Sequence, residues 1–147
     1  MTPTGAPEEF RFGPIAVRFR LEGEESGGTV TIHEFDVAAG AGIPLAHSHD
    51  SYEETIYGLA GTITFTVDGT PHDIRPGGML CILRGAVHSF VNSGDVTSTS
   101  LAIITPGILG PGYFREVAAI VDAAAGGPPD LAALGAVMKR HGLTPAP

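Results

Sequence analysis

The sequence predicts an all-β protein, a sandwich or closed barrel, followed by one or two α-helices at its carboxyl-terminal end. Apolar and polar residues alternate in several short stretches before residue 106, as they do in half-buried strands. Turn-forming residues separate these stretches roughly every 8 to 12 residues, which favours antiparallel strands over a parallel α/β sheet. The 21 glycines and 12 prolines, which follow no collagen-like period, supply these turns.

The size and charge of the chain limit its partners. Its 147 residues are enough for one domain. Eight basic residues stand against 16 acidic ones, and the net charge of −8 opposes binding to nucleic acid or to an anionic membrane. A small-molecule ligand or another protein therefore remains as a partner.

Three features indicate the cellular compartment. The single cysteine, Cys81, rules out an internal disulfide and is typical of a reducing compartment. The first ten residues lack the basic start and apolar stretch of a signal peptide. No apolar run approaches the roughly 18 residues of a membrane span. We therefore expect a soluble, cytoplasmic protein.

The strands are expected to begin after a short polar segment. Residues 1–10 are polar and proline-rich, and we expect them to be flexible. The stretches Ile15–Leu21 and 29–37 (TVTIHEFDV) have the pattern of strands. Residues 62–67 (TITFTV) alternate strictly, and the following Asp68-Gly69 pair is typical of a two-residue hairpin turn. Later strands are expected from residue 70, over 79–83 (MLCIL, a continuous apolar run typical of a buried strand), over 87–92 and over 97–105.

The composition changes after Pro106, so we divide the chain into a β-barrel over residues 11–105 and a helical extension over 106–147. Residues 113–125 (YFREVAAIVDAAA) have apolar side chains at helical spacing. Asp130 is expected to cap a second helix over 131–141. Gly142 is a suitable residue to end it.

Two of the six histidines, His47 and His49, stand one residue apart. On a strand, residues i and i+2 point to the same side, so both imidazoles would face one point. Because side chains alternate along a strand, only one of Glu53 and Glu54 can join them. Two imidazoles with a carboxylate are a ligand set for non-haem iron and also suit Mn, Ni, Cu or Zn. Taken alone, the pattern also fits a polar loop in which the histidines have no function.

The surrounding residues resemble the cupin family, whose first motif is G(X)5HXH(X)3,4E(X)6G. His47-Ser48-His49 is followed after four residues by Glu54, and then after six residues by Gly61. The leading glycine departs from the motif, since four residues instead of five separate Gly42 from His47.

The second cupin motif is G(X)5PXG(X)2H(X)3N, and it also has a counterpart here. Gly77, Gly85, His88 and Asn92 stand at its spacing, while Leu83 replaces the proline. Both departures fall on positions that shape the backbone, and neither position supplies a metal ligand.

The resemblance implies a cupin jelly-roll β-barrel (a double-stranded β-helix) with one divalent transition metal inside. The implied ligands are His47, His49, Glu54 and His88; the metal would be Fe, Mn, Ni, Cu or Zn. Glu53 is the competing ligand, because the motif allows its spacing, but Gly61 then falls one residue late. The two helices packed outside the barrel are similar to those of bacterial single-domain cupins related to quercetin 2,3-dioxygenases, and a homodimer is expected on the same ground.

The implied function is that of a metal-dependent dioxygenase, a quercetinase-like oxidoreductase, acting on a small hydroxylated or enolisable substrate within the barrel. Glu54 has a second, catalytic role in this hypothesis, because a carboxylate loosely held by a metal can accept a substrate proton. An isomerase or lyase on the same site, and a non-catalytic binding or sensing module, are the alternatives.

Other candidate residues favour structural interpretations. His33 is expected to be packed or at the surface rather than in a pocket, His72 to be exposed, and His141 to lie at a helix end. Arg84 is expected at the surface, and Asn92 is expected to hold a strand end. Core or barrel-lining positions are expected for Met79, Cys81, Ile56, Phe65, Phe90 and Ile103.

Overall fold

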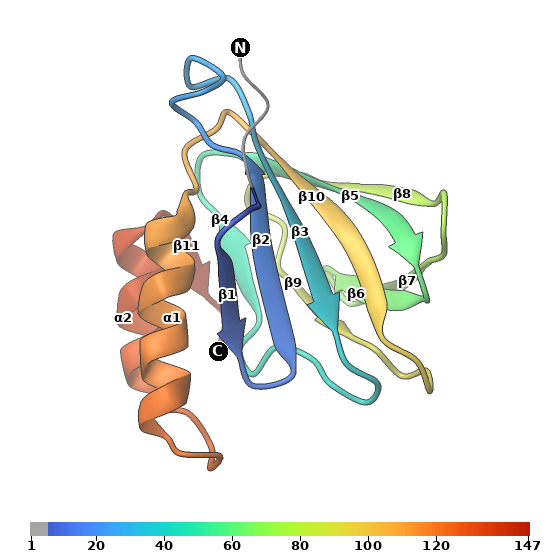
Figure 1. Ribbon diagram of the computed structural model, residues 1–147, viewed down its shortest axis with the longest axis vertical. Helices are drawn as coiled ribbons and strands as arrows, with labels where there is room; N and C mark the ends of the chain where they lie inside the picture. Colours follow the sequence, from blue (N-terminus) through green and yellow to red (C-terminus); the bar gives the residue numbers. More distant parts are fainter. Residues whose placement is uncertain (1–5) are drawn as a thin grey trace.

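Two antiparallel β-sheets face each other, and two helices lie along one side of them (Figure 1). The structure is a computed structural model that describes residues 6–147. One sheet has six strands in the order β1-β2-β3-β10-β5-β8, and the other has five in the order β11-β4-β9-β6-β7. The two sheets confirm the all-β architecture that the strand pattern predicts, and they have the jelly-roll arrangement that the cupin resemblance implies.

The strands follow the alternating stretches of the sequence closely. The expected strand Ile15–Leu21 has these bounds in the structure as well. The strands are β1 (Glu9–Phe12), β2 (Ile15–Leu21), β3 (Thr31–Val37), β4 (His47–His49), β5 (Glu53–Ala60), β6 (Ile63–Val67), β7 (Thr70–Ile74), β8 (Met79–Ile82), β9 (His88–Val91), β10 (Ser98–Thr105) and β11 (Leu143–Pro145).

Turn and strand-end residues have the roles expected of them. Asp68 and Gly69 have φ values of 46° and 83°, which is the left-handed conformation that a type I′ hairpin turn needs between β6 and β7. Asn92 is 0% exposed, and its side-chain amide donates to the carbonyl oxygens of Val37 (2.9 Å) and Val96 (2.8 Å). It therefore ties the end of β9 to the end of β3.

The strand expected over residues 79–83 forms as β8, but the prediction that it is buried is wrong. Met79 is 65% exposed, and the Cys81 thiol is exposed as well, whereas Ile82 is 1% exposed. The reason is the position of β8 at the edge of the six-stranded sheet, where its outer face has no covering layer. Ile103 does not line the barrel either, because it alternates with Ala102 and Ile104, both 0% exposed and facing the interior.

The prediction of a flexible segment over residues 1–10 is wrong from residue 9 onward. Strand β1 begins at Glu9 and pairs with β2, and Phe10 is 6% exposed against the edge of the Phe19 ring. Residues 1–5 lie outside the described residues, so the prediction is not tested there.

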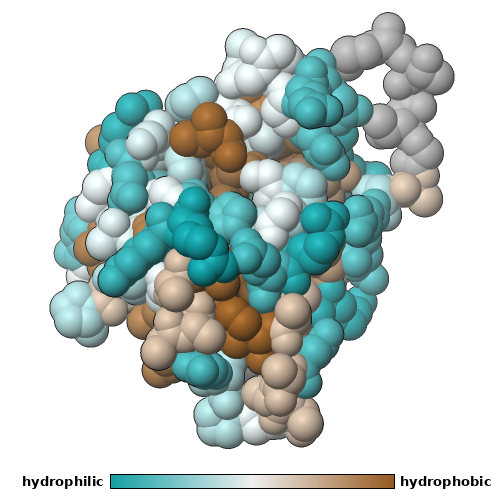
Figure 2. Space-filling model, turned by 90° about the vertical axis from the view of Figure 1, so that its left-hand side faces the viewer, coloured by the Kyte–Doolittle hydropathy of each residue, from teal (hydrophilic) through white to brown (hydrophobic). Residues whose placement is uncertain are grey.

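The helices cover an open side of the barrel instead of lying apart from its interior. Helix α1 (Pro111–Ala123) and helix α2 (Leu131–Arg140) form where the sequence predicts helices, and the Asp130 side chain accepts a hydrogen bond from the Ala133 amide (3.0 Å). Neither helix is long and apolar enough to cross a membrane. The surface on this side is mixed, with hydrophobic groups set among hydrophilic residues (Figure 2).

Strand β11 is the one element of the carboxyl-terminal region that the sequence does not predict. It pairs antiparallel with β4, with Leu143 opposite His49 and Pro145 opposite His47. The sequence does not indicate this strand, because the segment LTP has only three residues and contains proline, a residue found mainly in edge strands. Through this strand, the end of the described chain supports the strand that carries two histidines.

Removing residues 143–147 should destabilise the protein and loosen the histidine site. Leu143 is 1% exposed, so its loss should lower the free energy of unfolding by about 2–5 kcal/mol, as for other large core side chains. Denaturant unfolding and elemental analysis of the purified protein would measure both effects. Removal of the exposed Pro147 alone is the control. Unchanged metal content in the longer truncation would show that β11 does not support the site.

Candidate metal centre

Three imidazoles meet between two neighbouring strands of the five-stranded sheet. His47 and His49 come from β4, and His88 is the first residue of β9, where it pairs in register with His47. One ring nitrogen from each of the three lies within 4.8 Å of the others. His49 and His88 are each 2% exposed. The strand geometry inferred for the His-X-His pair is therefore confirmed.

The fourth group comes from the opposite sheet. Oε2 of Glu54, on β5, lies 3.5 Å from Nε2 of His49 and 3.4 Å from Nε2 of His88. Glu53 points away and binds Arg84 at the surface, with nitrogen–oxygen distances of 2.8 and 3.0 Å. Alternation along β5 thus places Glu54 beside the histidines and leaves Glu53 outside the site.

The ring orientations suit a bound cation. Nδ1 of His88 donates to the carbonyl oxygen of Ala86 (2.9 Å), and Nδ1 of His47 donates to that of Leu45 (3.3 Å). Because a carbonyl only accepts, each Nδ1 carries the proton and each Nε2 keeps a free lone pair. Nε2 of His88 is buried without a hydrogen-bond partner among the described residues. Histidines fixed through Nδ1 to a backbone carbonyl are typical metal ligands.

The charge states also fit a divalent metal. Burial and the neighbouring imidazoles lower the pKa of His47 to about 3, and burial lowers the pKa of His49. Burial opposes ionisation of Glu54, but contact with His88 and the nearby imidazoles bring its pKa down to about 2. Burial opposes protonation of His88, but its contact with Glu54 outweighs burial and raises the pKa of this ring. At neutral pH the site thus offers a carboxylate and the neutral imidazoles of His47 and His49, and a divalent cation would take the place of a proton on His88. Carboxylate and imidazole together are the donor set preferred by Fe, Mn, Ni, Cu or Zn.

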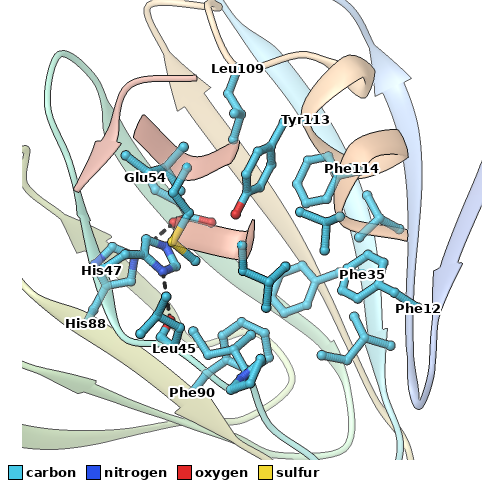
Figure 3. Close-up of a pocket in the computed structure, with 18 of the residues that line it drawn as sticks. Phe12, Phe35, Leu45, His47, Glu54, His88, Phe90, Leu109, Tyr113 and Phe114 are labelled. Atoms are coloured by element: carbon cyan, nitrogen blue, oxygen red, sulfur yellow. Dashed lines mark hydrogen bonds and ion pairs between the residues drawn. The ribbon is translucent and has the colours of Figure 1, made fainter. Parts of the chain in front are cut away.

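The site opens into an apolar cavity of about 110 Å³ between the two sheets and the helices (Figure 3). Phe65 and Phe90 line it, as the sequence analysis expected, whereas Ile56 is buried in the core without lining it. No lysine or arginine is among the described residues that line the cavity. Further apolar walls come from Phe12, Phe35, Leu109, Phe114, Val117 and Met138.

Helix α1 adds a polar residue that the sequence analysis missed. Tyr113 is 7% exposed, and its hydroxyl points into the cavity (Figure 3). The apolar spacing of residues 113–125 indicated a buried helix face, but nothing in that pattern says which surface the face covers. The cavity-lining role of Tyr113 could therefore not be inferred from the sequence.

The remaining histidines and aromatic residues lie in different surroundings. His33 is 3% exposed and packed, as expected, but it also lines the cavity, which was the disfavoured alternative. His72 is half-buried on β7, so the expectation that it is exposed is wrong. His141 forms an ion pair with Glu116 at the end of α2. Tyr52, 0% exposed, stacks on the ring of His49 with a centroid distance of 4.6 Å.

Comparison with known proteins identifies the fold family. The model of the cupin domain matches residues 33–104, a segment that contains all four groups of the site. The chain belongs to the cupin superfamily. A 50-residue stretch is 40% identical to protein SchB of Streptomyces halstedii; the match covers 34% of this chain and 36% of that protein.

Two solved structures have a similar fold. A predicted oxalate decarboxylase from Thermotoga maritima has a TM-score of 0.62 and 22% identity, covering 69% of this chain and 92% of that chain. The polyketide cyclase RemF from Streptomyces resistomycificus has a TM-score of 0.56 and 21% identity, covering 69% of this chain and 70% of that one. Similarity at these identities concerns the fold.

Replacing Glu54 should weaken metal retention more than replacing Glu53. Glu54→Ala removes a carboxylate beside the imidazoles, whereas Glu53→Ala removes only a surface ion pair. We expect a loss of metal affinity of at least about tenfold for Glu54→Ala and for His47→Ala and His88→Ala. Elemental analysis after dialysis would measure it, with His72→Ala as a control that keeps its metal. The reverse ranking of the two glutamates would contradict the ligand assignment.

Acid should destabilise the metal-free protein in part through His33. Burial lowers the pKa of His33 from 6.5 to about 4. Between these values the unfolded chain takes up a proton that the folded protein does not, so stability falls with falling pH, by on the order of 3 kcal/mol in total. Denaturant unfolding at several pH values would show a shallower fall for His33→Leu. Equal pH dependence in both proteins would show that the His33 pKa is not lowered.

Proposed function

We propose that this cupin is a metal-dependent enzyme, and specifically a quercetinase-like dioxygenase, that acts on a small hydroxylated or enolisable organic substrate. The observation that carries this proposal is the position of three imidazoles and one carboxylate in the wall of an apolar cavity that is open on one side. Such a site offers a cation two kinds of donor and offers an organic molecule a place beside it.

Each residue of the site has a defined task in this proposal. His47, His49, His88 and Glu54 would hold one divalent transition metal, which would act as a Lewis acid on a substrate hydroxyl. Glu54 is ionised at neutral pH, so it can accept the proton of that hydroxyl. The apolar walls contributed by α1 and α2 exclude water from the substrate.

The lining of the cavity restricts the substrate. Burial of an unpaired charge is costly, and away from the metal centre no cationic side chain among the described lining residues would pair with a carboxylate or a phosphate. The cavity therefore favours an aromatic or enolic compound that carries no charge on the part away from the metal. Dioxygen, itself apolar, suits the same surroundings.

A second candidate is a lyase or isomerase that uses the same groups without dioxygen. It is supported by the similarity to a cyclase and to a predicted oxalate decarboxylase. A binding or sensing module that retains metal without turnover is a third candidate. The homodimer expected from the family resemblance remains a prediction.

Oxygen uptake would test the proposed reaction. Protein purified without chelators or metal-affinity tags should contain about one metal ion per chain, and an electrode should record one dioxygen consumed per substrate in a panel of phenols and enols. The His88→Ala variant should reduce uptake to background, because it lacks one metal ligand. Product formed equally without oxygen would overturn the dioxygenase assignment and favour the second candidate. Metal binding with no product from any compound would favour the third.

A further inference from the structure

A buried histidine outside the metal centre has no hydrogen-bond partner. His33 lies on β3 and is 3% exposed, and its Nδ1 is unpaired among residues 6–147. The large majority of buried polar side-chain atoms in proteins are paired, because an unpaired one costs free energy on folding. His33 also lines the cavity, and Nε2, its other ring nitrogen, makes no hydrogen bond to a described residue, so a molecule inside the cavity is a suitable partner for the ring.

Aromatic rings hold the His33 ring in place but form no hydrogen bonds with its nitrogens. Ring centroids of Phe114, Phe19 and Phe35 lie 5.1, 5.2 and 6.2 Å from that of His33. These neighbours offer no hydrogen-bond donor or acceptor atoms in their side chains. A neutral imidazole has one N–H donor and one acceptor nitrogen, so its orientation is fixed while its hydrogen-bonding capacity stays available.

His33 and Glu54 belong to the same inner surface of the barrel. Ala102 on β10 lies opposite both His33 on β3 and Ile56 on β5, and Glu54 is two residues from Ile56 along β5. Two strand spacings thus separate the backbones of His33 and Glu54, about 10 Å across the sheet. The histidine is therefore displaced from the metal centre but belongs to the same cavity.

A second unpaired polar group faces the cavity from the helical side. The Tyr113 hydroxyl, on α1, points into the cavity and makes no hydrogen bond to another described residue (Figure 3). Apart from the four residues of the metal centre, His33 and Tyr113 are the polar side chains that line this part of the described structure.

We propose that His33 and Tyr113 form a second polar subsite, which binds an oxygen substituent of the substrate other than the one directed to the metal. This inference rests on the proposed function and names its ligand class: an uncharged single-ring compound with two hydroxyl or carbonyl oxygens. The cavity of about 110 Å³ is smaller than the closed cavity of about 150 Å³ that holds benzene, so it limits the ligand to one ring, part of which would extend into the open mouth of the cavity.

Binding of two matched probes to the metal-loaded protein tests the subsite. Hydroquinone carries two hydroxyl groups and phenol carries one, and anaerobic calorimetry gives the dissociation constant of each without turnover. We expect the wild-type protein to bind hydroquinone at least about fivefold more tightly than phenol, the effect of one additional hydrogen bond. Equal affinities, or binding of neither compound, would overturn the inference.

Variants assign the preference to the two residues. Tyr113→Phe removes only the hydroxyl, and His33→Leu removes both ring nitrogens. Each variant should weaken hydroquinone binding about fivefold. Each should change phenol binding less than twofold. His33→Gln, which keeps a donor and an acceptor, should restore part of the preference. If His33→Leu fails to fold, Tyr113→Phe and His33→Gln still carry the test.

Tyr52→Phe is the matched control, because Tyr52 is buried with an unpaired hydroxyl but does not line the cavity. It should leave the hydroquinone preference unchanged. Equal weakening of both probes by Tyr113→Phe and His33→Leu would show that these residues only shape the cavity, and would overturn the subsite. A retained preference without oxygen uptake would overturn the dioxygenase assignment alone and leave the subsite in place.

Discussion

The structure depends on bringing four polar side chains from two different sheets to one buried point. The pairing of His47 with His88 fixes two of the imidazoles across neighbouring strands, and the face-to-face packing of the sheets brings Glu54 to them. A shift of one residue in β5 would turn Glu53 inward and Glu54 outward. Strand register therefore sets the composition of the site, and the surrounding core maintains that register.

The burial that raises the free-energy cost of the site also strengthens the interactions within it. Charged and polar groups in an apolar enclosure interact more strongly than they do in water, because less solvent screens them. The helices are essential to this effect, since Tyr113, Phe114 and Met138 complete an enclosure that the sheets leave open. The jelly-roll positions the ligands, and the carboxyl-terminal helices supply the dry environment.

Local patterns in the sequence predict most of the strands and the four polar groups of the site. Strict alternation identifies Ile63–Val67, and the spacing of His47, His49, Glu54 and His88 indicates a common site. The two departures from the cupin motifs are harmless. Gly42 lies where a Cβ would meet the Phe90 carbonyl oxygen at 2.5 Å, so glycine is still required there, and Leu83 is 64% exposed.

What the sequence does not reveal depends on long-range packing. An apolar run such as MLCIL occurs in central strands and in edge strands alike. The exposure of Met79 can therefore be inferred only when the strand order is known. Strand β11 exists only because β4 provides a partner for it. The cavity roles of His33 and Tyr113 follow from which surfaces meet in three dimensions, and no spacing in the chain encodes that.

The exposed edge strand gives experimental access to the electronic state of an ion bound at the candidate metal centre. Cys81 is the single cysteine of the chain, and it lies opposite Thr55, the neighbour of Glu54, on the outer surface of the sheet. A nitroxide attached to this thiol would be separated from the ion by one layer of β-structure. A paramagnetic ion such as manganese would quicken the spin relaxation of the nitroxide, whereas zinc would leave it unchanged.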